Sequence, residues 1–251
     1  MKNQIFTSFF IFGFISAMLS GCSKSATTPD TTTQTSTVPK ISYNFSDAYG
    51  VLVALNTVST QTVGGYTIPV QINTPTAAFP LTIGGTSFQD GGAVTFNTKP
   101  LAKQSNNAYV YTDLANPVTY DQAIWSVSGS VNVPAFNYTD SRFFPEFTNQ
   151  ANLPGAFSKM AGLAVVLGGF TNNADSIYVV IISTVNGKSV MKRLPGNAVT
   201  STFSPSDVAV LGTGAGYLEV CPWTYSIQQF NSKSFYFIKE AAYVAVIKIN
   251  N

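Results

Sequence analysis

The sequence predicts an all-β fold, with one or two β-sandwich domains of immunoglobulin-like type that follow a disordered tether. Three observations support this prediction. Runs rich in Val, Ile, Thr and aromatic residues recur at roughly the 8–12-residue spacing of sandwich strands. Gly-Gly and Asn-Gly pairs separate many of these runs. Helical periodicity is scarce, and the clearest candidate is a single turn over Pro205–Leu211 with Ser204 as its N-cap.

The individual strands follow from their residue patterns. Ala123–Val133 alternates between two faces, which indicates a half-buried strand. Ile177–Ile182 is β-branched and aromatic throughout, which suits a central strand covered on both faces. The following pair, Asn186-Gly187, predicts a tight type I′ hairpin into a strand at Ser189–Leu194. The other predicted strands are 51–58, 66–72, 81–83, 93–96, 108–111, 161–167, 217–227, 234–238 and 242–249.

Two β-sandwich-like domains, 41–145 and 146–251, fit this series of strands. A break in the strand pattern over Pro134–Pro154 marks the boundary between them. No internal repeat supports the division, so a single elongated β domain is the alternative.

The first 22 residues have the pattern of a bacterial export signal. Lys2 precedes the mostly apolar stretch Ile5–Leu19, which is short for a membrane span. Leu19-Ser20-Gly21-Cys22 then resembles the lipobox of bacterial lipoproteins. This resemblance implies removal of residues 1–21 and attachment of diacylglycerol to the Cys22 thiol. The Ser/Thr-rich stretch 22–40 then becomes a disordered tether.

The lipobox resemblance also implies a location. The protein is expected at the outer membrane of a Gram-negative bacterium, anchored by lipid. Ser23 after the cysteine favours that membrane over the inner one. The sequence leaves open whether the body faces the periplasm or the cell surface.

The composition argues against several classes of function. The 13 basic and 11 acidic residues give a net charge of +2 and form no basic cluster, so nucleic acid is not an expected partner. The chain has no histidine, the usual general base and the commonest metal ligand. We therefore expect no metal, no cofactor and no enzyme activity. A carboxylate-based glycoside hydrolase needs two acids, for which Asp140 with Glu146 is one choice.

Several strings and residues are expected to be structural. Ser189–Lys192 matches a penicillin-binding motif but lies on a predicted strand. Gly212–Gly216 lacks the dinucleotide-binding spacing and is expected to be a flexible loop. Asn172–Asp175 lacks the spacing of a calcium loop and is expected to be a turn. Three further residues lie in strand-like runs and are expected in the core, namely Trp125, Cys221 and Trp223.

An aromatic segment, residues 136–147, is the best candidate for a binding surface. Aromatic rings offer large contact areas at low entropic cost, which suits sugar faces or peptides. The alternative is a plug of rings between two domains. The candidate ligand-binding residues are Phe136, Tyr138, Arg142, Phe143 and Phe144.

These observations favour a non-catalytic envelope lipoprotein that binds a ligand such as a polysaccharide. The general architecture, a lipidated β-sandwich, resembles that of surface glycan-binding lipoproteins. A structural or assembly component of an envelope protein complex is the second hypothesis. The carboxylate-based hydrolase is the third.

The lipid anchor can be tested directly. Mass spectrometry of the mature protein is expected to find Cys22 at its N-terminus carrying acyl chains, because only a lipidated cysteine anchors the chain. Cys22→Ala should remove both the lipid mass and the membrane association. Cys221→Ala, which changes the other cysteine of the chain, should leave both unchanged. An unmodified residue 22 in the parent protein would contradict the prediction.

Overall fold

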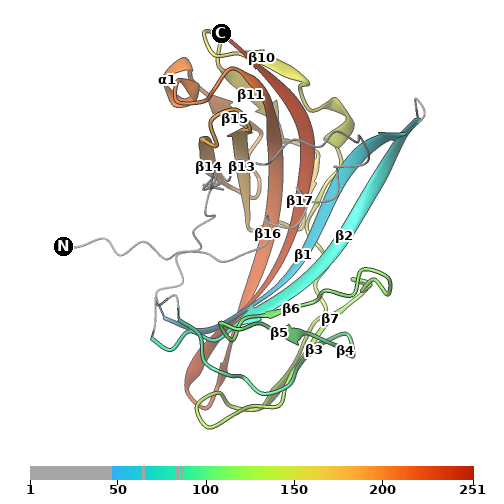
Figure 1. Cartoon of the computed structure of the whole chain (residues 1–251), viewed down its shortest axis with the longest axis vertical. Coiled ribbons are helices and arrows are strands. Elements are labelled where there is room, and N and C mark those ends of the chain that lie inside the picture. The colour runs from blue at the N-terminus through green and yellow to red at the C-terminus, as the bar shows by residue number, and fades with distance from the viewer. Residues whose placement is uncertain (1–46, 64–65, 83–84, 86) are drawn as a thin grey trace, which may run out of the picture.

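The protein is nearly all β, as predicted, with small sheets packed against one large sheet (Figure 1). The structure is a computed structural model that describes residues 47–63, 66–82, 85 and 87–251. The predictions for the signal peptide, for Cys22 and for the tether at 22–40 lie outside these residues.

The large sheet has nine strands. β1 and β17 pair in parallel, β10 joins the end of β17 in parallel, and the remaining pairs are antiparallel. Its strands lie in the order β14 (Ser189–Pro195), β13 (Ser176–Ser183), β16 (Gly214–Phe230), β17 (Lys233–Asn250), β1 (Ala48–Val63), β2 (Tyr66–Ala78), β6 (Tyr109–Val110) and β5 (Ala102–Lys103), with β10 (Ala156–Ser158) beside β17.

Three smaller sheets complete the fold. One has the order β4 (Lys99–Pro100), β3 (Val94–Phe96), β7 (Ala123–Val127) and β8 (Phe136–Asp140); the others are the pairs β11 (Leu163–Val166) with β15 (Thr200–Phe203) and β12 (Thr171–Asn172) with β9 (Glu146–Phe147). The helical turns are α1 (Pro205–Val208) and the 3-10 helix η2 (Gln150–Asn152). In Figure 1, β3, β4 and β7 lie at the lower end of the long strands, and β11, β15 and α1 at the upper end.

The smaller sheets pack on one face of the large sheet, which we call the core face. Side chains two residues apart on a strand share a face, so the register assigns Leu52, Phe237 and Leu218 to this face. Two clusters of buried apolar residues cover it. The first contains the lower small sheet and Trp125, and the second contains β11, β15 and Phe147.

Strand β17 contributes to both clusters. Phe235 and Phe237 belong to the first cluster, and Ile247 and Ile249 belong to the second. The remaining members of the first cluster come from Leu52–Phe136, and all members of the second come from residues after Asp140. The cores thus separate near the predicted boundary while one sheet runs through both. The choice between one domain and two stays a prediction.

Two corrections concern strand boundaries. The predicted break over Pro134–Pro154 contains β8 and β9, because the prolines of this region flank strands instead of replacing them. The strand predicted over Ala123–Val133 ends at Val127. Gly129 has a φ of +81°, and the Ser130 amide donates to the Val133 carbonyl, so the chain turns there toward β8.

The tight type I′ turns lie elsewhere than predicted. Asn186-Gly187 does lie in the β13–β14 hairpin, but only Gly187 has positive φ, and the amide of Ser183 pairs with the Lys188 carbonyl around a four-residue loop. Two-residue turns with both φ values positive occur at Asn97-Thr98 and Asn231-Ser232. Asn231-Ser232 joins the two longest strands.

The glycine-rich string is the start of a strand. β16 begins at Gly214, so only Gly212 and Thr213 of the predicted loop lie outside a strand. A Cβ atom on Gly216 would lie 2.4 Å from the Ile182 carbonyl oxygen. Glycine therefore lets β16 approach β13 here.

Other predictions are confirmed. Ile177–Ile182 lies inside β13, a strand paired on both sides, and Ser189–Lys192 lies on β14. Trp125 and Trp223 are each 1% exposed. Ser204 forms a capping box with Asp207 at the start of α1.

The opposite face of the large sheet holds two buried carboxyl groups. Glu219 lies on this face of β16 with Cys221 and is 2% exposed. Burial raises the pKa of Glu219 to about 7 and that of Glu240 to about 8, because a charged carboxylate loses its hydration there. Burial and the nearby Glu219 likewise raise the pKa of the Cys221 thiol, which fits a core residue.

We expect Glu219 to make the protein less stable as pH rises. Its carboxyl keeps its proton in the folded state up to about pH 7, whereas the unfolded chain releases it near 4.5. Its contribution to the free energy of unfolding therefore falls between these pH values. Glu219→Gln should raise the melting temperature more at pH 8 than at pH 4.

The control for this experiment is Glu146→Gln, which changes an exposed carboxylate. It should shift the melting temperature little at either pH. An equal effect of Glu219→Gln at pH 4 and pH 8 would contradict the prediction.

Candidate functional site

The aromatic segment 136–147 links the two cores. Phe136 is 6% exposed in the first cluster, and its ring stacks on Phe230 with centroids 4.3 Å apart. Phe147 is 1% exposed in the second cluster, where its ring contacts Tyr243 edge-on. The two ends of the segment are thus core residues, and any contact with a ligand falls to the residues between them.

Tyr138 is half-buried and held at both ends. Its ring lies over Phe237 with centroids 3.9 Å apart, and its hydroxyl is 2.5 Å from the Ser226 hydroxyl. β8 is thereby fixed to the core face of the large sheet. Tyr138 positions this segment and presents little ring surface to a ligand.

A network of ion pairs follows β8 at the joint between the cores. Arg142 donates to both carboxylate oxygens of Asp140, at 3.1 and 2.8 Å. Lys239 of β17 lies 3.2 Å from the Asp140 carboxylate and donates to the carbonyls of Asp140 and Arg142. Arg142 also donates to the Thr224 hydroxyl at 2.9 Å, and that hydroxyl donates to Asp175. The Lys239 and Asp140 side chains are 3% and 4% exposed.

Lys239 was missed by the sequence analysis. It lies with Glu240 inside a long apolar run, and a charged pair in such a run is a signal for a buried ionic contact. The partner Asp140 lies about a hundred residues earlier, so the sequence pattern did not connect them.

The network fixes the charge of Asp140. Burial alone would raise its pKa, but the hydrogen bonds from Arg142 and the positive charges of Lys239 and Arg142 outweigh burial and hold the pKa below its usual value. A general acid must keep its proton at working pH, so Asp140 suits an ion-pair role. Glu146 lies exposed on β9. The carboxylate-hydrolase hypothesis stays a prediction, because a hydrolase needs one ionised carboxylate as well as one protonated acid.

Phe143 is the exposed ring of the segment. It is 81% exposed and directly follows Arg142, whose side chain is 43% exposed. The next residue, Phe144, stacks on Tyr120 with ring centroids 4.9 Å apart. An exposed ring between two anchored residues is positioned to contact a flat ligand.

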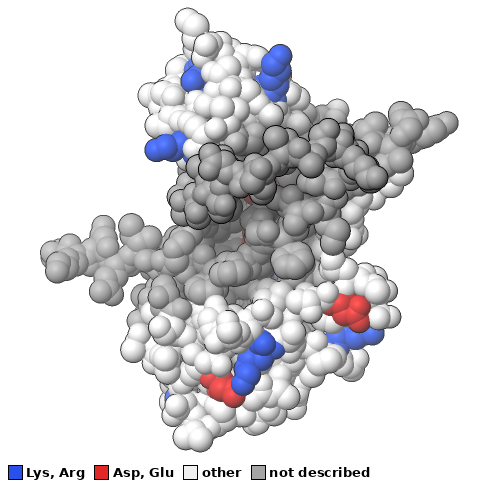
Figure 2. All heavy atoms as spheres, in the orientation of Figure 1, with Lys and Arg blue, Asp and Glu red and all other residues white. Residues whose placement is uncertain are grey.

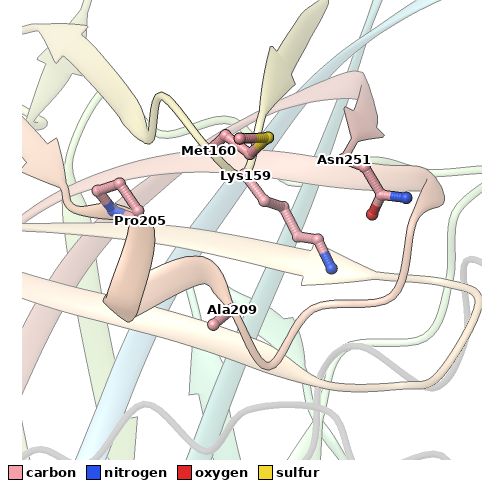
Figure 3. Close-up of a pocket in the computed structure, with 5 residues that line it drawn as sticks. All are labelled: Lys159, Met160, Pro205, Ala209 and Asn251. Atoms are coloured by element: carbon pink, nitrogen blue, oxygen red, sulfur yellow. The ribbon is translucent and has the colours of Figure 1, made fainter.

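A separate surface pocket of about 430 Å³ lies beside α1 and the end of β10, at the upper end of the molecule in Figure 1, and Figure 3 shows its lining residues. It is lined by Lys159 and Met160 after β10, by Pro205 and Ala209 around α1, and by Asn251. The Lys159 amine donates to the Leu211 carbonyl at 3.0 Å, so it holds the pocket wall together. No sequence signal pointed to this pocket, because three distant segments form it.

The described residues contain no group of three or more His, Cys, Asp or Glu side chains arranged to hold a metal ion. Within those same residues, no helix is long and apolar enough to cross a membrane. Cys22 lies outside the described residues, so its lipidation stays a prediction.

The comparisons with known proteins give no assignment. No protein family model matches the chain, and no curated protein matches it. The function therefore has to be argued from the geometry of the described residues.

Asp140→Asn is expected to be strongly destabilising. The change leaves Lys239 buried without its counter-charge, which typically costs about 3–5 kcal/mol. Replacing both members, as Asp140→Asn with Lys239→Met, should recover much of that loss, because no unpaired charge then remains buried. Urea unfolding measures both effects.

Asp121→Asn, a change of an exposed aspartate, serves as the control and should be nearly neutral. A loss for Asp140→Asn as small as that of the control would show that the network is not a buried ion pair in solution.

Proposed function

We propose that this protein is a non-catalytic, lipid-anchored binding protein of a Gram-negative envelope, and that its β body holds a polysaccharide by contact. The exposed ring of Phe143 is the observation that carries the proposal. An apolar ring at 81% exposure adds little to the core, and most of its surface is open to contact with another molecule.

The anchoring of this ring supports the proposal. Arg142, immediately before Phe143, is tied to Asp140 and Thr224, and Phe144, immediately after it, is stacked on Tyr120. Because its neighbours are fixed, the loop loses little conformational freedom when a ligand binds. A preformed aromatic contact of this kind suits the apolar face of a sugar ring.

The charges of the aromatic segment favour ligand binding over catalysis. The charges of Arg142 and Lys239 face those of Asp140 and Asp175, so the network is internally neutral. With no proton-donating acid identified among these groups, binding is the function that the arrangement supports best. The sorting of the lipid anchor decides whether the β body faces the periplasm or the cell surface.

A structural or assembly role in an envelope complex is the second candidate. One observation favours it: among the described strands, the outer edge of β2 from Tyr66 to Thr74 pairs with none. An open strand edge is a template for pairing with another chain.

Phe143→Ala tests the proposed function. It should weaken retention of the protein in gels containing polysaccharide by about tenfold in Kd, because loss of one stacking ring removes about 1.4 kcal/mol. Its melting temperature should stay near that of the parent, since the ring is outside the core.

The control is Val131→Ala, which shortens a fully exposed apolar side chain in the turn between β7 and β8, outside the segment. It should retain full binding. Equal binding by Phe143→Ala and the control would refute the role of this ring. Co-purification of a stoichiometric protein partner, with no polysaccharide retained, would favour the assembly role.

A further inference from the structure

Strands β1 and β2 carry no charged residue. Their 16 and 13 residues are apolar or are Ser, Thr, Asn, Gln, Gly, Tyr and Pro. Among the described residues in Figure 2, Lys and Arg side chains lie on the upper part of the molecule and both signs of charge lie on the lower part. A surface with hydrogen-bonding groups but no charge suits a ligand with the same character.

Three amide side chains of these strands lie together. Asn56 of β1 is directly opposite Asn73 of β2, and Gln71 is two residues from Asn73. Residues two apart share a face, so all three point to the core face of the large sheet. We call Asn56, Gln71 and Asn73 the amide strip.

The strip lies between the two cores. Along β1 it follows Leu52 and Ala54, which belong to the first cluster. On its other side the Gln150 amide donates to the carbonyls of Val58 and Val244, where β1 and β17 separate. The strip therefore occupies the part of the core face between the two buried clusters.

The fold uses little of the hydrogen-bonding capacity of these amides. Asn73 donates to the Val118 carbonyl at 2.6 Å, and Gln71 makes one long contact of 3.5 Å with Asn73. The Asn56 side-chain oxygen is itself buried and has no hydrogen-bond partner in the part of the chain that the structure describes, so a ligand would reach it only by entering between the side chains that cover it. Gln71 is exposed, and Asn56 and Asn73 are half-buried.

The strip adjoins the aromatic segment. The Tyr120 hydroxyl donates to the Leu55 carbonyl at 2.7 Å, one residue before Asn56. Phe144 stacks on Tyr120, and Phe143 precedes it in the chain. Rings and amides thus meet on one side of β1.

We propose that the amide strip is a second contact surface for the ligand, and that the ligand is an uncharged polysaccharide. This inference rests on the proposed function and extends it from one ring to an extended site. A side-chain amide offers a donor and an acceptor side by side, which matches neighbouring hydroxyl groups of a sugar. Because β1 and β2 carry no charge, the strip itself has no cation that would attract an acidic polymer.

The experiment compares parent and variant proteins in affinity gels cast with mannan, a linear β-glucan, xylan or polygalacturonate. The variants are Asn56→Ala and Gln71→Ala, neither of which removes a strong hydrogen bond of the fold. The control is Gln229→Ala, which changes an exposed glutamine on the opposite face of the same sheet.

The parent is expected to bind at least one of the three uncharged polymers more tightly than polygalacturonate. Asn56→Ala with Gln71→Ala together should weaken that binding about tenfold, as expected for two lost hydrogen bonds. Gln229→Ala should bind like the parent. The single variant Gln71→Ala should fold like the parent, because its side chain is exposed, so any loss of binding by this variant is not due to misfolding. The melting temperature of each variant is measured as well.

Other outcomes overturn the inference in distinguishable ways. If Phe143→Ala weakens binding and the amide variants do not, the amide strip is not part of the binding site, and the proposed function still holds. Tighter binding of polygalacturonate would refute the uncharged ligand. If the parent protein binds none of the four polymers, both the proposed function and this inference are refuted. In that case a concentration-dependent dimer would point to pairing at the edge of β2.

Discussion

The backbone pairing of β17 is the interaction on which the rest of the structure depends. This strand of 18 residues pairs with β16 along most of its length, with β1 over its first half and with β10 at its end. Both apolar cores rest on its side chains. Every other surface of the molecule is therefore positioned relative to one ladder of hydrogen bonds, which keeps the two small layers in a fixed relation.

The ion-pair network of Asp140, Arg142 and Lys239 holds the chain where it crosses between the two cores. Two cores on one sheet leave a joint, and β8 must cross it to reach β9. Lys239 reaches from the sheet to Asp140 and to two backbone carbonyls there, so the crossing chain is tied to β17. Buried charges of this kind add little net stability, but only one geometry satisfies them, and they favour a unique structure for the joint. These contacts also fix the position of the exposed Phe143 ring, which directly follows Arg142.

The surface chemistry agrees with this architecture. Charged residues make up 10% of the chain, and the two long strands β1 and β2 have none. Amides and hydroxyls supply the polar surface in their place, and they interact with neutral groups at short range. Such a surface gains affinity from many directional contacts on a rigid sheet, a property that matches the proposed role in holding an extended, hydroxyl-rich ligand.

The sequence by itself determined the all-β class, the burial of Ile177–Ile181, Trp125 and Trp223, and the capped turn at Ser204, because each depends on local periodicity or local hydrogen bonding. It also indicated the aromatic segment, without separating its packed rings from its exposed one. Only the tertiary structure decided that Phe136 is core and Phe143 is surface, and that Lys239 meets Asp140. Those outcomes depend on strand order and on contacts between distant residues, which no local pattern encodes. The same reason explains why the amide strip appears only once β1 and β2 are in register.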